Sequence, residues 1–145
     1  MTIEAILEVI DANSNIRDDQ LDREDERCYK IQFKYQNMLI VERKTLYKLQ
    51  ERESQLKLYK EMFYQGKLEA KEYKGKQFDA SLKIVKSDLP LWVNADTEMQ
   101  KIREEINEQE IKIDTLMNAL NVANYRNNHV KNHFEILRFM NGGQK

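Results

Sequence analysis

The feature that most constrains the fold is a long stretch from Asp19 to Tyr64 that contains neither proline nor glycine. Apolar residues recur along it three, four or seven positions apart, at Cys28, Ile31, Tyr35, Met38, Leu39, Leu46, Leu49, Leu56 and Phe63. This spacing predicts one long amphipathic helix, either continuous or broken once. Glu42, Glu53 and Lys60 interrupt the apolar stripe. A continuous two-stranded zipper therefore fits poorly, and we expect part of the helix to face water or a ligand.

A second long helix is predicted near residue 97. Pro90 excludes helix at Leu89, and Thr97 followed by Gln100 has the spacing of a capping box. Residues then alternate three and four apart at Met99, Ile102, Ile106, Gln109, Ile113, Leu116, Leu120 and Ala123, and a second apolar face comprises Ile111, Met117 and Val122. The helical pattern continues through residues 125–140. A helix with two apolar faces has more than one neighbour, which favours a multi-helix or ring-like assembly.

Shorter segments complete a mainly α fold. Residues 2–11 predict a short amphipathic helix that begins behind a Thr2 cap, and Gly66 predicts the end of the first long helix. Residues 67–77 are expected to form a mobile, charged connector. The segment near 78–89 is compatible with a short helix or an extended chain, and we favour a helix followed by extended chain.

Charge is segregated along the chain, although the net charge is only −1. Residues 1–42 hold five Lys/Arg against ten Asp/Glu, residues 43–86 hold twelve against six, and residues 87–145 hold seven against nine. We therefore divide the chain into an N-terminal helical region, 1–86, with a basic segment at about 43–86, and a C-terminal helical region, 87–145, that we expect to oligomerise. The candidate oligomerisation residues are Ile113, Leu116, Leu120, Val130, Phe134 and Leu137.

The sequence offers no set of residues for catalysis, metal binding or a cofactor. Its four glycines form neither a phosphate-binding loop nor a dinucleotide fingerprint. His129 and His133 share a helix face, but zinc needs three or four ligands and the zincin glutamate is absent. Cys28 lies within a predicted helix and is interpreted as a packing residue. We expect no enzyme activity, no cofactor and no metal.

Cellular location is only weakly indicated. A single cysteine excludes an internal disulfide and fits a reducing compartment. No apolar run approaches the roughly 18 residues that cross a bilayer, and the N-terminus lacks the pattern of a signal peptide. We expect a cytoplasmic protein that does not enter the membrane.

A basic stretch interleaved with aromatic residues, Lys57 to Lys76, is the best candidate binding surface. Lysines neutralise phosphates, and aromatic rings stack on unpaired bases of any sequence. The candidate DNA-binding residues are Lys57, Lys60, Tyr64, Lys67, Lys71, Lys74 and Lys76, with Tyr64 as the stacking residue. Two alternatives stay open: the lysines form a solvated face above a core of rings, or the segment binds an acidic protein partner, as in a structural coiled coil or assembly chaperone.

Three segments together resemble the UvsY family, the recombination mediators of T-even-type bacteriophages. They are Lys57 to Lys67 ending in Phe63-Tyr64-Gln65-Gly66-Lys67, Leu82 to Asp88 followed by Asn94-Ala95-Asp96, and the tail from Tyr125 to Gly142. The family's basic motif often reads Lys-Ala-Arg-Leu, whereas the matching residues here are Leu58-Tyr59-Lys60-Glu61. Only Lys60 carries over, and whether Lys57 substitutes for the missing charge stays open.

The resemblance implies a non-enzymatic protein of the host cell cytoplasm. It implies a homo-oligomeric helical ring of six or seven subunits, assembled through the C-terminal region, that binds single-stranded DNA. It further implies two protein partners, a phage RecA-like recombinase and the phage single-strand-binding protein, with the first replacing the second on DNA.

Overall fold

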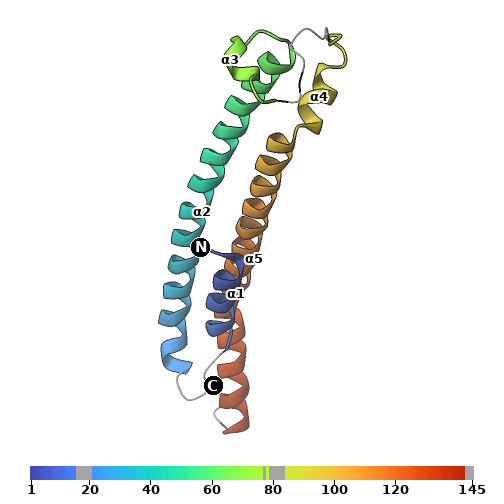
Figure 1. Ribbon diagram of the computed structural model, residues 1–145. Coiled ribbons are helices and arrows are strands. Elements are labelled where there is room, and N and C mark those ends of the chain that lie inside the picture. The colour runs from blue at the N-terminus through green and yellow to red at the C-terminus, as the bar shows by residue number, and fades with distance from the viewer. Residues whose placement is uncertain (16–20, 77, 79–83, 143–145) are drawn as a thin grey trace. The chain divides into compact units, whose positions relative to one another are not determined.

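The computed structural model describes residues 1–15, 21–76, 78 and 84–142, and in these ranges the regular structure is helical. The described ranges contain five helices: α1 (Ile3–Ala12), α2 (Leu21–Tyr64), α3 (Ala70–Tyr73), α4 (Leu89–Ala95) and α5 (Thr97–Met140) (Figure 1). Contacts divide the chain into two units. Unit 1 comprises Met1–Arg43 with Ile111–Lys145, and unit 2 comprises Lys44–Glu110.

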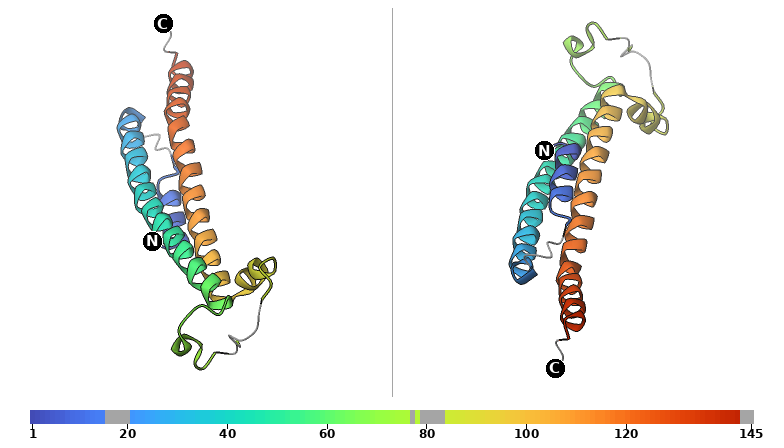
Figure 2. Two further views of the ribbon diagram at one scale, coloured as in Figure 1. Left: turned by 90° about the horizontal axis from the view of Figure 1, so that it is seen from above. Right: turned by 90° about the horizontal axis from the view of Figure 1, so that it is seen from below.

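Unit 1 packs α1 against the N-terminal part of α2 and the C-terminal part of α5 (Figure 2). Thr2 caps α1, because its hydroxyl accepts a hydrogen bond from the backbone N–H of Ala5 at 3.2 Å. The buried apolar residues of this unit are Ile6, Cys28, Ile31, Tyr35, Leu39, Ile113, Leu116, Ala119, Ala123 and Val130. They come from all three helices, so the short helix α1 is part of the core.

A buried ion pair fixes the segment after α1 in unit 1. The Arg126 guanidinium lies 3.2 Å from the Glu24 carboxylate, and both side chains are buried. Arg126 also donates to the backbone carbonyls of Asn13 and Asn15. One side chain on α5 therefore holds both the start of α2 and the chain that leaves α1.

Unit 2 packs the C-terminal part of α2 against α4 and the N-terminal part of α5. Leu89 and Val93, one turn apart on α4, are buried with Met99, and Leu56 and Tyr64 pack against them. At the end of α2, Gly66 has a φ of 72°. The N–H of Gly66 donates to the Phe63 carbonyl and that of Lys67 to the Met62 carbonyl, each at 3.1 Å. These bonds form a Schellman motif that ends the helix and turns the chain.

The two long helices, the Thr2 cap of α1 and the Gly66 end of α2 agree with the sequence prediction. The helix α1 begins behind Thr2, α2 runs without a break to the turn at Gly66, and α5 is one helix through residues 97–140. Every predicted core position of α5 is buried except Leu120, which is half-buried. Local spacing was sufficient here because each pattern extends over many turns.

Three local predictions were wrong. Leu89 belongs to α4, since proline is tolerated in the first turn of a helix, and Pro90 occupies that turn. The cap of α5 is Asp96, not Thr97, because the Asp96 Oδ1 accepts from the N–H groups of Glu98 and Met99 at 2.9 and 3.2 Å. The predicted connector contains the short helix α3.

In the segment near 78–89, Phe78, Ile84 and Val85 adopt neither helix nor strand, and residues 79–83 lie outside the described ranges.

The polar residues that interrupt the α2 stripe have charged partners, and two of them are buried. Glu42 is buried 3.7 Å from the N-terminal amine of Met1, and Lys60 is buried beside Asp96. Glu53, half-buried, lies 3.8 Å from Arg103. The sequence pattern predicts that α2 faces water or a ligand at these positions. In the structure they belong to its packed face instead.

Within the described residues, no helix combines the length and apolar character needed to cross a membrane.

Candidate nucleic-acid interface

An aromatic cluster surrounds the end of α2 in unit 2. The Phe63 ring lies at its centre, with ring centroids 4.7 Å from Tyr73, 5.2 Å from Phe78 and 5.2 Å from Tyr64. Trp92 extends the cluster, 5.8 Å from Tyr64 and 6.1 Å from Phe78. Rings from α2, α3, α4 and the chain between them thus converge on one site.

Polar groups of tyrosines hold the segment after α2 against this cluster. The Tyr73 hydroxyl donates to the Phe63 carbonyl at 2.7 Å and accepts from the Leu68 N–H at 3.4 Å. The Tyr59 hydroxyl donates to Glu72 at 2.9 Å, and this hydrogen bond raises the pKa of Tyr59. The predicted connector is therefore fixed by contacts with α2 that local sequence does not reveal.

Lys60 and Tyr64 both bind Asp96 inside unit 2. The Lys60 ammonium lies 3.1 Å from Asp96 Oδ2 and 3.6 Å from Glu98, and the Tyr64 hydroxyl donates to Asp96 Oδ2 at 2.6 Å. Burial opposes ionisation of Asp96, but the hydrogen bonds from Tyr64, Lys60 and the Met99 backbone outweigh it and lower its pKa. Burial and the bond to Asp96 raise the pKa of Tyr64. Both predicted DNA-binding residues are thus occupied by intramolecular contacts.

The other predicted DNA-binding lysines point to solvent. Lys57, Lys67, Lys71, Lys74 and Lys76 are exposed. The Lys76 ammonium lies 5.8 Å from the Phe63 ring centroid, and Lys71 makes a surface ion pair with Glu69 at 3.1 Å. Four of them, at positions 67–76, follow the end of α2, so the structure presents cationic groups beside the aromatic cluster.

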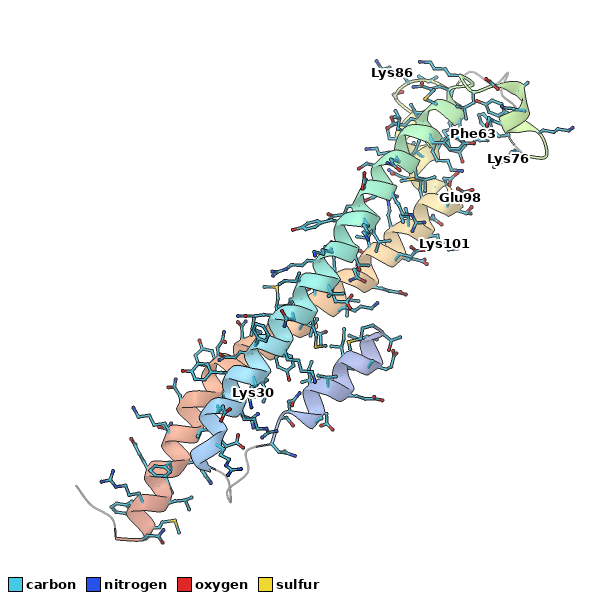
Figure 3. All side chains as sticks on the ribbon, turned by 90° about the vertical axis from the view of Figure 1, so that its left-hand side faces the viewer. Lys30, Phe63, Lys76, Lys86, Glu98 and Lys101 are labelled. Atoms are coloured by element: carbon cyan, nitrogen blue, oxygen red, sulfur yellow. The ribbon has the colours of Figure 1, made fainter. Side chains whose placement is uncertain are left out.

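Two further residues at this site were not predicted from the sequence. Lys86 is exposed in the turn before α4, and Figure 3 shows it at the end of unit 2 that holds Phe63 and Lys76. Trp92 is 44% exposed. Pro90, two residues before Trp92, is compatible with the first turn of a helix, but that signal does not indicate which residues Trp92 contacts. Its partners Tyr64 and Phe78 are distant in sequence.

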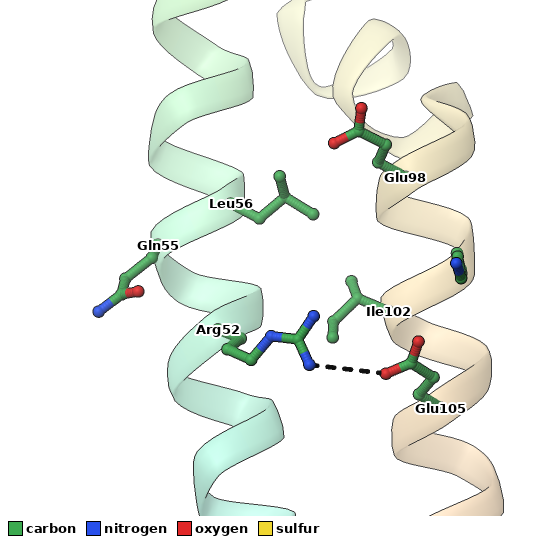
Figure 4. A pocket seen from close by; sticks show the side chains of 7 residues that line it. Arg52, Gln55, Leu56, Glu98, Ile102 and Glu105 are labelled. Carbon is green, nitrogen blue, oxygen red and sulfur yellow. Dashed lines mark ion pairs between the residues drawn. The ribbon is translucent and has the colours of Figure 1, made fainter.

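Unit 2 also contains a groove of about 510 Å³ between α2 and α5. Arg52, Gln55, Leu56, Glu98, Lys101, Ile102 and Glu105 line it (Figure 4). Arg52 lies 3.9 Å from Glu105. The two cations of the groove, Arg52 and Lys101, are matched by the carboxylates of Glu98 and Glu105. The groove therefore does not favour a polyanion.

The predicted oligomerisation residues fall into two classes. Ile113, Leu116 and Val130 are buried in the core of their own unit. Leu120 and Leu137 are half-buried, and Phe134 is 53% exposed. Exposed apolar residues on α5 also include Ile111, Met117, Val122, Tyr125, Ile136, Phe139 and Met140. The exposed residues leave apolar side chains on the surface of α5, whereas the buried ones stabilise the fold of unit 1.

The described part of the chain contains no group of three or more His, Cys, Asp or Glu side chains arranged to hold a metal ion. Cys28 is buried in the core of unit 1, and His129 is exposed on α5.

Comparison with known proteins identifies the family. Two crystal structures of the recombination mediator protein UvsY from bacteriophage T4 have the same fold. One, of lattice type IV, has a TM-score of 0.83 and 16% identity and covers 96% of this chain and 99% of that chain. The other, of lattice type II, has a TM-score of 0.80 and 18% identity and covers 99% of both. Among curated proteins, none matches. A family model described as "Recombination, repair and ssDNA binding protein UvsY" matches residues 9–143, and the chain belongs to the UvsY family.

Proposed function

We propose that this protein is a recombination mediator that binds single-stranded DNA at the lysine-rich end of unit 2. The observation that carries the proposal is the position of exposed lysines, Lys67 to Lys76, beside the aromatic cluster. Cations release counterions from the DNA backbone, and aromatic surface accepts unpaired bases. Family membership supports the same function.

The proposed phosphate-binding set is Lys57, Lys67, Lys71, Lys74 and Lys76, with Lys86 added. Lys60 is assigned a different role, because a buried ammonium between two carboxylates has no free charge to offer a phosphate. Lys57 is exposed on α2 one turn before Lys60 and supplies a cation there.

The mechanism that we propose depends on repetition. Six or seven identical subunits would present the same weak site many times, so that each bound segment raises the effective concentration of the next site. DNA held by many salt-sensitive contacts would be reshaped while single-strand-binding protein leaves and the RecA-like recombinase nucleates. The exposed apolar residues of α5, such as Phe134 and Phe139, are the proposed subunit contacts.

Affinity for a labelled oligo(dT), measured by anisotropy against salt, tests DNA binding. Replacing Lys74 and Lys76 together by Ala is expected to weaken binding and to lower the log–log salt slope by about 0.7 for each phosphate that is no longer neutralised. The matched control replaces Lys44 and Lys48, two exposed lysines of α2 in the same unit, and should leave the slope unchanged. Equal slopes for both double variants would contradict the proposed site.

The same assay separates the mediator from a coiled-coil chaperone that binds an acidic protein. A mediator complex with DNA is competed by poly-dT, whereas a chaperone complex with its protein partner would be unaffected.

Mass measurement of the native particle tests the assembly, since a closed six- or seven-subunit ring differs from a dimer or trimer.

A further inference from the structure

Trp92 is the aromatic residue of the cluster with the most accessible ring. Phe63 is buried, and Tyr64 is half-buried with its hydroxyl bound to Asp96. Trp92, in contrast, is 44% exposed, and the two described rings beside it, Tyr64 and Phe78, contact it at interplanar angles of 45° and 68°. Neither of these two rings is stacked parallel on the indole, so ring surface is left for a planar group from outside.

The position of Trp92 is fixed by its own helix. Leu89 and Val93 anchor α4 in the core with Met99, and the N–H of Trp92 donates to the Asp88 carbonyl at 3.3 Å. Leu91, the preceding residue, is exposed. The helix α4 therefore buries the side that carries Leu89 and Val93 and holds the Trp92 indole at the margin of that side. Because the indole is already held in place, binding a ligand costs little conformational entropy.

The surroundings of Trp92 select a polyanion with planar groups. A continuous series of ring contacts leads from Lys76, over the Phe63 ring at 5.8 Å, through Phe78 to Trp92. Lys86 is exposed in the turn that precedes α4. Lys76 and Lys86 both lie at the end of unit 2 that holds the aromatic cluster, so cations are available there for the phosphates linked to a stacked base.

We infer that Trp92 stacks on an unpaired base of single-stranded DNA while Lys76 and Lys86 bind adjacent phosphates. This inference rests on the proposed function and assigns base contact to a residue of α4, outside the basic segment of residues 43–86. Tyr64 then supports the indole from within the cluster, and its own ring is not the stacking surface.

The test uses the fluorescence of Trp92, because the chain contains one tryptophan. The full-length protein is titrated with oligo(dT) and with an abasic oligonucleotide of equal length, which keeps the phosphates but lacks bases. We expect saturable quenching with oligo(dT) and none with the abasic strand. Trp92→Ala should weaken oligo(dT) binding, followed by anisotropy, roughly 5- to 150-fold, which corresponds to one stacked base. Its affinity for the abasic strand should equal that of wild type.

Two further variants provide controls. Trp92→Phe keeps a stacking ring and should restore most of the affinity for oligo(dT). Tyr47→Ala removes an exposed ring from α2 of the same unit and should leave binding unchanged. Circular dichroism verifies that each variant is folded.

Each other outcome contradicts the inference in a recognisable way. Equal binding of oligo(dT) by wild type and Trp92→Ala would overturn base stacking and leave DNA binding intact. A change in native particle mass on Trp92→Ala without DNA would reassign the indole to a subunit contact. Failure of both oligonucleotides to bind wild type would overturn the proposed function together with this inference.

Discussion

The ammonium of Lys60 and the carboxylate of Asp96 form an ion pair at 3.1 Å with both side chains buried. Asp96 also caps α5 and accepts the Tyr64 hydroxyl, so one carboxylate joins the end of α2 to the start of α5 within unit 2. The one basic residue that matches the family's motif is thus an internal support for the aromatic cluster.

Lys60→Ala should destabilise the protein by about 3–5 kcal/mol, because it leaves the buried Asp96 charge without its cation. Urea unfolding followed by circular dichroism measures this loss. Lys57→Ala, an exposed lysine on the same helix, should change the free energy of unfolding by less than about 0.5 kcal/mol. If Lys60→Ala unfolded like wild type yet bound oligo(dT) more weakly, Lys60 would be a DNA contact after all.

The lowered pKa of Asp96 predicts acid sensitivity. Because its folded pKa lies below the unfolded value of 3.8, the ionised carboxylate contributes stability that is complete well above pH 3.8. That contribution is lost as the pH falls through the folded pKa. Asp96→Asn keeps a capping oxygen but no charge, so it should be less stable than wild type at pH 7. The difference between the two proteins should shrink below pH 3.8 in urea unfolding. A difference that is constant with pH would show that the charge of Asp96 is not involved.

Sequence patterns predicted the parts of this fold that depend on long local repeats. Thr2, Gly66 and the periodic apolar residues of α2 and α5 were sufficient to place three helices. The short helices α3 and α4 were missed for different reasons. Tyr73 fixes α3 through a hydrogen bond to the Phe63 carbonyl, a contact that local sequence does not indicate. Pro90 indicates a helix break by residue type alone, but it is compatible with the first turn of α4.

The candidate site was predictable in composition but not in the roles of its residues. The exposure of lysines such as Lys74 and Lys76 is predictable, because they lie in a charged segment that follows the end of a helix. The burial of Lys60 depends on Asp96, which lies next to a different helix and is distant in sequence. Trp92 joins the site only because α4 packs beside the end of α2 through Leu89 and Val93.

Gly66 should be sensitive to substitution because of its backbone conformation. Its φ of 72° lies in the left-handed region, where an L-residue with a Cβ is disfavoured by about 1–2 kcal/mol. Gly66→Ala should lower the free energy of unfolding by about that amount, as measured in urea. Gly66→Asn should lose less, because asparagine tolerates this conformation. Equal losses for Ala and Asn would indicate that the space around Gly66, and not its φ, is limiting.

Arg126→Met should loosen α1 selectively. It leaves Glu24 with Arg27, which donates to Glu24 at 3.1 Å, but removes the donors to the Asn13 and Asn15 carbonyls. We expect a loss of about 3 kcal/mol, at the lower end for a broken buried pair, and faster amide exchange in α1 by mass spectrometry. Arg138→Met, an exposed arginine in the last turn of α5, is the control. Unchanged exchange in α1 would contradict the anchoring role.

Substitutions at Leu116 and Phe134 on α5 should distinguish the folding of one subunit from its self-association. Leu116 is fully buried within unit 1, so Leu116→Ala should destabilise the subunit by about 2–5 kcal/mol. Phe134 is 53% exposed, so Phe134→Glu should leave the circular dichroism spectrum unchanged but lower the native mass measured by light scattering, because a carboxylate cannot be buried without a partner. Tyr29→Glu, at an exposed aromatic of α2 in the same unit, controls for added charge. A Phe134→Glu particle of wild-type mass would exclude this residue from the subunit contact, since a charge at a buried interface could not leave the assembly intact.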